Sequence, residues 1–314
     1  MSLNYEILDH MSGHLGDAFY LLDSKKFEKN FDEFLSVFTA IYPKSNIGYS
    51  YKTNYTPKLC KLIDAKGGYA EVVSEMEYDL AIKLGVNPEM IIVNGPYKTK
   101  QALEKFLLGG SIVNLDSYAE VELLKTIVQS HFDKKFSIGL RCNFEINNAS
   151  ISRFGFDVES DNFGAMFSEI SNIDNVVING IHCHFPNRDL ESYSYRVDKI
   201  LELAQRLFST PPKYIDIGGG FFSKMKGSLK AQFSTPTVEY DAYANLIATK
   251  FSQFYQDYSD ENKPILLLEP GSAIVADTMY FVAKVIDLKE VRGRKIATSS
   301  GSKFNMGLLT STIS

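Results

Sequence analysis

The chain has 314 residues, of which 45% are hydrophobic and 23% are charged, and its formal net charge at pH 7 is -5. This is the composition of a globular protein that is long enough to bury one large core or two smaller ones. The sequence contains no run rich in Lys and Arg, and its apolar runs are too short to cross a bilayer, so we expect neither a nucleic-acid partner nor a membrane span.

The first 44 residues predict a strand at 18–22, within GDAFYLLD, and a helix at 25–41. From residue 47 onward, short apolar runs rich in β-forming residues alternate with longer stretches whose apolar residues recur about every 3.6 positions. The runs predict eight strands, at 47–52, 69–73, 90–94, 111–115, 137–143, 176–184, 213–217 and 265–269.

The stretches between these strands predict helices, for example at 74–84, 117–128 and 195–207. Ser74 and Ser117 precede Glu77 and Glu120 by three residues, which is the spacing of a capping box. Repeated strand–helix units predict a parallel sheet with right-handed crossovers. Eight units favour an α/β fold of the closed (β/α)8 type, a TIM-like barrel, and an open doubly wound sheet is the alternative.

The segment after the eighth strand has a different pattern. An alternating run at 280–288, a turn at 292–294 and a strand at 295–298 predict antiparallel strands. We therefore divide the chain into an N-terminal strand segment at 1–24 that joins a second β domain, a barrel at 25–275, and the start of that C-terminal β domain, apparently truncated, at 276–314. The loop at 223–235, rich in Lys, Gly and Ser, is expected to be mobile.

Three cysteines without CxxC spacing, Cys60, Cys142 and Cys183, argue against a disulfide scaffold or a structural zinc site. The polar, acidic N-terminus is not that of a signal peptide, so we expect a reducing cytoplasm. Cys142 and Cys183 lie within apolar strands and are expected to be buried packing residues.

The active site of a barrel lies at the carboxyl ends of its strands, and polar residues end the predicted strands of this chain. Ionisable groups are therefore expected to converge on one rim. They include Lys52, Glu71, Asp116, Arg141, His182, His184, Asp216 and Glu269.

Lys52 ends the first barrel strand, which should be buried on both faces. A lysine inside the barrel mouth would be costly to desolvate as a cation, so its pKa should fall and a neutral amine would become available for imine formation. A solvated lysine just beyond the strand end is the alternative.

Gly218, Gly219 and Gly220 follow the seventh strand, where barrels commonly bind phosphate. Three glycines allow the backbone to approach an anion and to present N–H groups to it, although a tight turn explains them equally well. Glu269 ends an apolar strand, so it must either stay protonated or have a cationic partner, which could be a protonated ring nitrogen of a ligand or a nearby Lys or Arg.

His182 and His184 share one face of a strand and could both ligate a metal, but the sequence offers no second compact set of ligands, so we expect no metal. Stacking on a planar cofactor suits His184, and core packing suits His182. Arg141 could hold a carboxylate or pair with Glu71 or Asp216.

Taken in order, these motifs resemble the fold-type III pyridoxal-phosphate decarboxylases, the group of diaminopimelate, ornithine, lysine and arginine decarboxylases. The likeness runs from GDAFYLLD at 16–23 to the end of the chain. It rests on YSYKTN, AEVVSEMEY, NGPYK, NLDSYAEVE, LRCN, SRFGF, GIHCH, DIGGGF and LEPG, each at or near a strand end.

The resemblance implies a pyridoxal 5'-phosphate cofactor linked to Lys52 as a Schiff base. It implies catalytic roles for Lys52, His184, which would stack on the pyridine ring, and Glu269, which would pair with the pyridine nitrogen. The implied cofactor contacts are Lys52, Glu71, Arg141, His184, Asn187, Gly218, Gly219, Gly220, Glu269, Gly271 and Ser272.

The chain departs from the family pattern at three points. Ser272 stands where the family usually has an arginine that touches the phosphate, and Asn187 stands where a phosphate-holding serine is expected. The family's C-terminal domain supplies a cysteine proton donor, an acidic substrate ligand and a tyrosine, but no cysteine follows Cys183 and the chain stops at Ser314.

We therefore expect a lyase that decarboxylates a basic or diamino acid through an external aldimine, as a homodimer. A pyridoxal-phosphate racemase or epimerase, a non-catalytic cofactor carrier, and a metal-dependent hydrolase using His182, His184 and Asp216 are the alternatives. The expected partner is this small-molecule amino-acid substrate, and no nucleic acid or membrane is expected as a partner.

Overall fold

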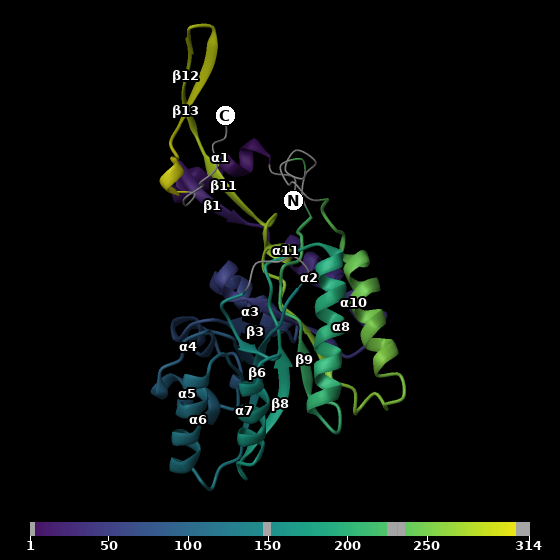
Figure 1. Ribbon diagram of the computed structural model, residues 1–314. Helices are drawn as coiled ribbons and strands as arrows, with labels where there is room; N and C mark the ends of the chain where they lie inside the picture. The colour runs from purple at the N-terminus through teal and green to yellow at the C-terminus, as the bar shows by residue number, and fades with distance from the viewer. Residues whose placement is uncertain (1–3, 147–151, 225–230, 232–235, 306–314) are drawn as a thin grey trace.

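The computed structural model describes residues 4–146, 152–224, 231 and 236–305. Its centre is a closed barrel of parallel strands, with helices on the outside (Figure 1). The strands in barrel order are β2 (Ser45–Ser50), β3 (Tyr69–Val72), β4 (Ile91–Val93), β5 (Ile112–Leu115), β6 (Phe136–Asn143), β8 (Val176–His182), β9 (Tyr214–Asp216) and β10 (Ile265–Leu268). Because β5 pairs with β6 and β10 pairs with β2, the barrel closes, which confirms the predicted fold class and excludes the open sheet.

A helix follows each barrel strand, so all eight predicted strand–helix units are present. These helices are α3 (Pro57–Ala65), α4 (Glu75–Lys83), α5 (Lys100–Leu108), α6 (Tyr118–Ser130), α7 (Asp161–Ser171), α8 (Leu190–Leu207), α10 (Tyr240–Phe254) and the short α11 (Ser272–Val275). A two-residue strand, β7 (Phe156–Asp157), pairs with the end of β6, and short 3-10 turns lie at Tyr51–Thr53, Pro88–Met90 and Lys303–Asn305.

The predicted caps are present and explain where two of the helices begin. Ser74 and Ser117 accept hydrogen bonds from the backbone N–H groups of Glu77 and Glu120, at 3.3 and 3.4 Å. The Glu77 and Glu120 carboxylates accept in turn from backbone N–H groups just before the helices. Each box therefore starts its helix directly after a strand and holds the carboxyl end of that strand in place.

The barrel is filled by side chains from its strands. Ile92, Tyr214 and Leu267 are buried together inside it, whereas the larger core lies between the strands and the surrounding helices. Gly139 and Gly180 face the Tyr214 ring, and an added Cβ at either position would collide with it. The two glycines thus make room for a tyrosine at the barrel centre, and its hydroxyl donates to Asn114 Oδ1 at 2.7 Å.

The strand register decides which polar residues become neighbours at the rim. Ser50 lies beside Glu71, Arg141 lies beside His182, and His182 lies beside Asp216 in adjacent parallel strands. Since the carboxyl ends of all eight strands meet at one rim, residues from distant parts of the sequence come into contact there.

The segments outside the barrel are antiparallel, as predicted, but the run predicted at 280–288 is divided between two strands that belong to different sheets. Strand β1 (Ala18–Leu22) pairs with β11 (Met279–Ala283), and β12 (Val285–Val291) pairs with β13 (Arg294–Ser299) in a hairpin that projects away from the barrel (Figure 1). Helix α2 (Ser24–Thr39) connects β1 to the barrel. The division of the chain into a barrel and a second β domain remains our interpretation of this arrangement.

One helix was missed by the sequence patterns. Helix α1 (Tyr5–Leu15) has Asn4 as its N-cap, and the Asn4 side chain accepts from Ile7 N at 3.0 Å. None of its residues is buried, although Tyr5, Leu8, Met11 and Leu15 recur at helical spacing, so the sequence did carry a periodic signal for this helix. Within the described ranges, we find no helix that combines the length and the apolar character needed to traverse a bilayer.

Candidate functional site

Lys52 lies in a 3-10 turn that directly follows β2, and its side chain is 41% exposed. Its Nζ lies 3.5 Å from Oε2 of Glu71. Burial lowers the pKa of Lys52, but the negative charges of Glu71 and Glu269 outweigh that effect and raise the pKa above its ordinary value. The expected fall in the pKa of Lys52 is therefore wrong, because two carboxylates on other strands face the amine.

Glu71 and Asn94 connect Lys52 to the far side of the barrel mouth. The Glu71 carboxylate accepts a 2.6 Å hydrogen bond from Ser50 Oγ, and its Oε1 lies 3.4 Å from Asn94 Nδ2. The same Asn94 amide donates to Glu269, and its Oδ1 accepts from Asn114 at 2.7 Å. One buried asparagine thus connects two carboxylates, and burial raises the pKa of Glu71.

Glu269 directly follows β10 and is buried between two histidines. Its Oε1 lies 3.5 Å from His182 Nε2, and its Oε2 lies 3.4 Å from His184 Nδ1. Burial favours the protonated acid, but His182, His184 and Lys52 together hold the pKa of Glu269 well below its ordinary value. The site therefore keeps a negative charge at the end of β10.

Asp216 is the second carboxylate beside these histidines, and its pKa shifts in the opposite direction to that of Glu269. Its Oδ1 accepts from the backbone N–H of Gly218 at 2.8 Å, and its Oδ2 has no hydrogen-bond partner among the described residues. Burial, and then the Glu269 charge, raise the pKa of Asp216 well above its usual range. We infer that Asp216 is protonated when Glu269 is ionised, because two adjacent buried carboxylates cannot both be charged without a large penalty.

His182, Asp216 and Glu269 also place one potential ligand atom each within 4.8 Å of the others. This differs from the set His182, His184 and Asp216 considered for a metal, because Glu269 and not His184 completes the group. Burial lowers the pKa of His182 to about 4, so this histidine is neutral at pH 7.

The glycine turn, which consists of Gly218, Gly219 and Gly220, lies against the cluster around Glu269. The backbone N–H of Gly219 donates to His184 Nδ1 at 3.0 Å, and Glu269 N donates to the carbonyl oxygen of Gly218 at 3.0 Å. Gly218 and Gly220 have positive φ values of 70° and 97°, which favour glycine. An added Cβ at Gly219 would collide with the carbonyl oxygen of Glu269, so all three glycines are needed for this close approach.

Three further residues from the expected set lie around this turn. The carbonyl oxygen of Asn187 faces Gly220, 3.0 Å from where a Cβ would stand. An added Cβ at Gly271 would collide with Thr53, in the turn that carries Lys52. Ser272 begins α11, directly after Gly271. These positions bring the EPG segment, the lysine turn and the glycine turn to one end of the barrel.

Arg141 has a different partner from those considered in the sequence. It forms an ion pair with Asp116 at 3.1 Å and donates to the carbonyl oxygen of Asn94 at 3.3 Å, so within the described residues its partner is neither Glu71 nor Asp216, the two that the sequence offered as alternatives. Its guanidinium also lies 4.6 Å from the centre of the Phe154 ring. Cys142 and Cys183 are buried free thiols, as predicted, and the predicted mobile loop at 223–235 lies mostly outside the described residues.

Two buried groups beside this rim were not identified from the sequence as site residues. Asn94 opens the motif NGPYK, and its position at a strand end was the only signal available. Arg196 lies within the amphipathic pattern of α8, where an arginine is expected to be solvated, and it is fully buried instead.

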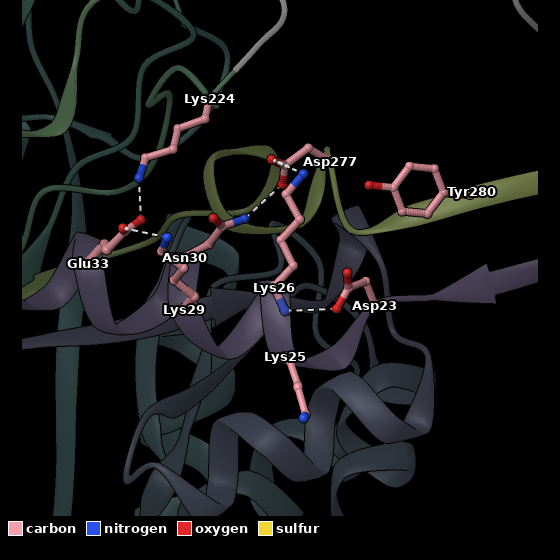
Figure 2. A pocket seen from close by; sticks show the side chains of 9 residues that line it. All are labelled: Asp23, Lys25, Lys26, Lys29, Asn30, Glu33, Lys224, Asp277 and Tyr280. Carbon is pink, nitrogen blue, oxygen red and sulfur yellow. Dashed lines mark hydrogen bonds and ion pairs between the residues drawn. The ribbon is translucent and has the colours of Figure 1, made fainter. Parts of the chain in front are cut away.

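A separate cavity of about 490 Å³ lies where α2 meets α11 and β11 (Figure 2). Its charges are largely paired: Lys26 contacts Asp277 at 2.8 Å, and Lys29 and Lys224 both contact Glu33. Asn30 is buried and donates to the backbone of α11 at 3.0 Å, at Ile274. We interpret this cavity as an ionic junction that holds α11 against α2.

The sequence is similar to those of known proteins. The family described as "Pyridoxal-dependent decarboxylase, pyridoxal binding domain" matches residues 25–276. The diaminopimelate decarboxylase of Aquifex aeolicus is 28% identical over 295 residues, which cover 90% of this chain and 66% of that protein. That of Archaeoglobus fulgidus is 24% identical over 91% of this chain and 68% of its own length. The chain spans about two thirds of the length of the curated relatives that it matches.

Solved structures share the fold. The diaminopimelate decarboxylase of Helicobacter pylori complexed with L-lysine has a TM-score of 0.77 and 23% identity, covering 95% of this chain and 73% of that one. The lysine/ornithine decarboxylase of Vibrio vulnificus complexed with putrescine has a TM-score of 0.72 and 17% identity, covering 95% and 76%. At these identities the structural likeness supports the fold alone.

Proposed function

Because the chain belongs to the pyridoxal-dependent decarboxylase family, we propose that it binds pyridoxal phosphate at this rim and decarboxylates a diamino acid. One observation carries the proposal. A continuous series of contacts runs from Lys52 through Glu71, Asn94 and Glu269 to His184, and His184 accepts from the glycine turn.

The residues present fit the cofactor on three grounds. The glycine turn has the two positive φ values and the lack of side chains that close approach of a phosphate requires. In the described part of the chain, the backbone N–H groups of Gly220 and Phe221 have no hydrogen-bond partner. Glu269 is a buried carboxylate held in its charged form, which suits a protonated ring nitrogen.

Bound pyridoxal phosphate supplies an electron sink for the pair released when the bond from Cα to the carboxylate breaks. Lys52 is the amine that would hold the cofactor covalently. Its raised pKa keeps it protonated at neutral pH, so a base must remove a proton before the amine can react. Glu71 lies 3.5 Å away with a pKa raised by burial, and we assign it that role.

Glu269 and His184 would act on the ring of the cofactor. The carboxylate would stabilise a proton on the ring nitrogen, and the imidazole of His184 would lie against the ring face. Asn94 orients both carboxylates by donating to each of them. Arg141, Asn187, Gly271 and Ser272 complete the proposed cofactor contacts around the glycine turn and the mouth.

The proposed substrate class comes from the relatives. Those named here are diaminopimelate decarboxylases, and the Helicobacter pylori protein of that name has been solved with L-lysine. We therefore propose a diamino acid of the diaminopimelate or ornithine type. We also propose that the protein is a homodimer and that it works in a reducing cytoplasm. The three free thiols support the reducing compartment.

The test uses purified protein reconstituted with pyridoxal phosphate and then reduced with borohydride. We expect the cofactor on the peptide that contains Lys52, and loss of both the label and the visible absorbance in Lys52→Ala. Lys58→Ala, in the exposed first turn of α3, is the matched control and should keep both. Labelling elsewhere would overturn the assignment. Release of carbon dioxide and an amine from meso-diaminopimelate or L-ornithine supports decarboxylation, whereas inversion of configuration at Cα without that release indicates a racemase or epimerase.

A further inference from the structure

Arg196 is a fully buried arginine directly beneath the glycine turn. It lies on α8, and its NH1 donates to the carbonyl oxygen of Gly219 at 3.3 Å. Its NH2 donates to the carbonyl oxygen of Asn187 at 2.6 Å and to Ser192 Oγ at 3.3 Å. One guanidinium therefore connects the loop after β8 to the turn after β9.

This cation lacks an acidic partner. Within the described ranges, no carboxylate forms an ion pair with Arg196, and its Nε has no hydrogen-bond partner. The Tyr193 ring lies 3.8 Å from the guanidinium carbon and gives partial compensation. Because an arginine stays protonated in proteins, its full charge is retained in a place from which water is excluded. A buried charge of this kind favours an anion nearby.

The direction of its hydrogen bonds indicates where that anion would lie. In a trans peptide the C=O of one residue and the N–H of the next point in opposite directions. Arg196 and Tyr193 both hold the carbonyl oxygen of Gly219, at 3.3 and 2.8 Å, so the N–H of Gly220 points away from them. Arg196 also holds the carbonyl oxygen of Asn187, so the N–H of Arg188 points away from the guanidinium in the same manner.

We propose that Arg196 is a positioning residue for the phosphate group of the cofactor, acting through the Gly219–Gly220 and Asn187–Arg188 peptides and supplying the buried positive charge behind them. The proposal rests on the proposed function, since it concerns the same cofactor. It adds a residue of α8 that touches neither the cofactor nor the reacting atoms. Accepting a hydrogen bond from a cation polarises each peptide, so its opposite N–H becomes a stronger donor to an anion.

The experiment compares ligands with and without the phosphate group. The dissociation constants of pyridoxal phosphate, pyridoxal and inorganic phosphate are measured for the cofactor-free wild type, Arg196→Met and Arg196→Lys. We expect Arg196→Met to weaken pyridoxal phosphate and inorganic phosphate by about tenfold or more, with pyridoxal changed by less than about twofold. Arg196→Lys keeps the charge and loses the paired donation. Its affinities for pyridoxal phosphate and inorganic phosphate should therefore lie between those of the wild type and Arg196→Met.

Arg206→Met is the matched control, since Arg206 is on the same helix and donates to the backbone of Val158 at 3.0 Å. It should leave the affinities for all three ligands unchanged. Equal weakening of pyridoxal and pyridoxal phosphate by Arg196→Met would indicate a merely structural role and overturn the proposal, as would unchanged phosphate binding. If Arg196→Met does not fold, the ratio of the two affinities in Arg196→Lys decides, and a ratio equal to that of the wild type overturns the proposal.

The proposed function fails separately from this inference. A wild type that binds inorganic phosphate in an Arg196-dependent way but never forms a covalent link at Lys52 would contradict the proposed function alone. A wild type that binds neither phosphate nor pyridoxal phosphate would contradict both.

Discussion

His182 Nε2 lies 3.5 Å from Oε1 of Glu269, and both side chains are only 1% exposed. Burial lowers the pKa of His182 to about 4, from an ordinary value near 6.5. The folded protein therefore keeps this imidazole neutral in a pH range where the unfolded chain binds a proton. A histidine of this kind makes the stability of the fold depend on pH.

The first prediction concerns that dependence. A lowered folded-state pKa contributes stability above the unfolded value of about 6.5, and that stability is lost as the pH falls through about 4. The loss amounts to about 3 kcal/mol at most. In His182→Gln the free energy of unfolding should fall less steeply between pH 7 and pH 4, as measured by chemical denaturation. His14→Gln, at an exposed position in α1, should reproduce the slope of the wild type.

The second prediction concerns Asp216, whose pKa is raised by folding, whereas that of His182 is lowered. Its raised folded-state pKa gives stability that is complete below the unfolded pKa of about 3.9 and is lost as the pH rises through the folded value. Asp216→Asn keeps the neutral shape and does not titrate. Its free energy of unfolding, relative to wild type, should therefore increase from pH 4 to pH 8. A difference that does not change over that range would show that Asp216 is ionised in the folded protein.

Asn94 provides the third prediction. Asn94→Asp would place a third carboxylate against Glu71 and Glu269 and would remove the amide that donates to both. We expect the free energy of unfolding at pH 8 to fall by about 3 kcal/mol, with partial recovery near pH 5, because one buried carboxylate becomes protonated. Asn87→Asp changes an exposed cap, where aspartate serves as well as asparagine, and should be nearly neutral. An equal effect of the two substitutions would argue against the buried network.

The fourth prediction tests the close approach of the glycine turn to β10. In Gly219→Ala the new methyl group would meet the carbonyl oxygen of Glu269, and we expect a loss of about 1–3 kcal/mol in unfolding free energy and weaker cofactor binding. Gly164→Ala is the control, because Gly164 lies in α7 with open space around it. That change should stabilise the helix by about 0.5–1 kcal/mol. Unchanged stability and cofactor affinity in Gly219→Ala would mean that the turn can move away from β10.

Much of the fold could be predicted because it depends on local patterns. The apolar runs and the 3.6-residue periodicity depend on neighbours along the chain, and so do the caps at Ser74 and Ser117. Helix α1 was missed although Tyr5, Leu8, Met11 and Leu15 recur at helical spacing, and it buries none of its residues. The hairpin of β12 and β13 followed from alternation around the turn at Arg292 and Gly293.

The sequence by itself determined the order of strands and helices, and it placed polar residues at the strand ends. Those features depend on side-chain periodicity and backbone preference, which act over a few residues. Only the tertiary structure decided the charge state of each group, because that depends on partners from distant strands. Glu71 and Glu269 reverse the expected shift at Lys52, Asp116 and not Glu71 neutralises Arg141, and the burial of Arg196 arises from the packing of α8 beneath the glycine turn.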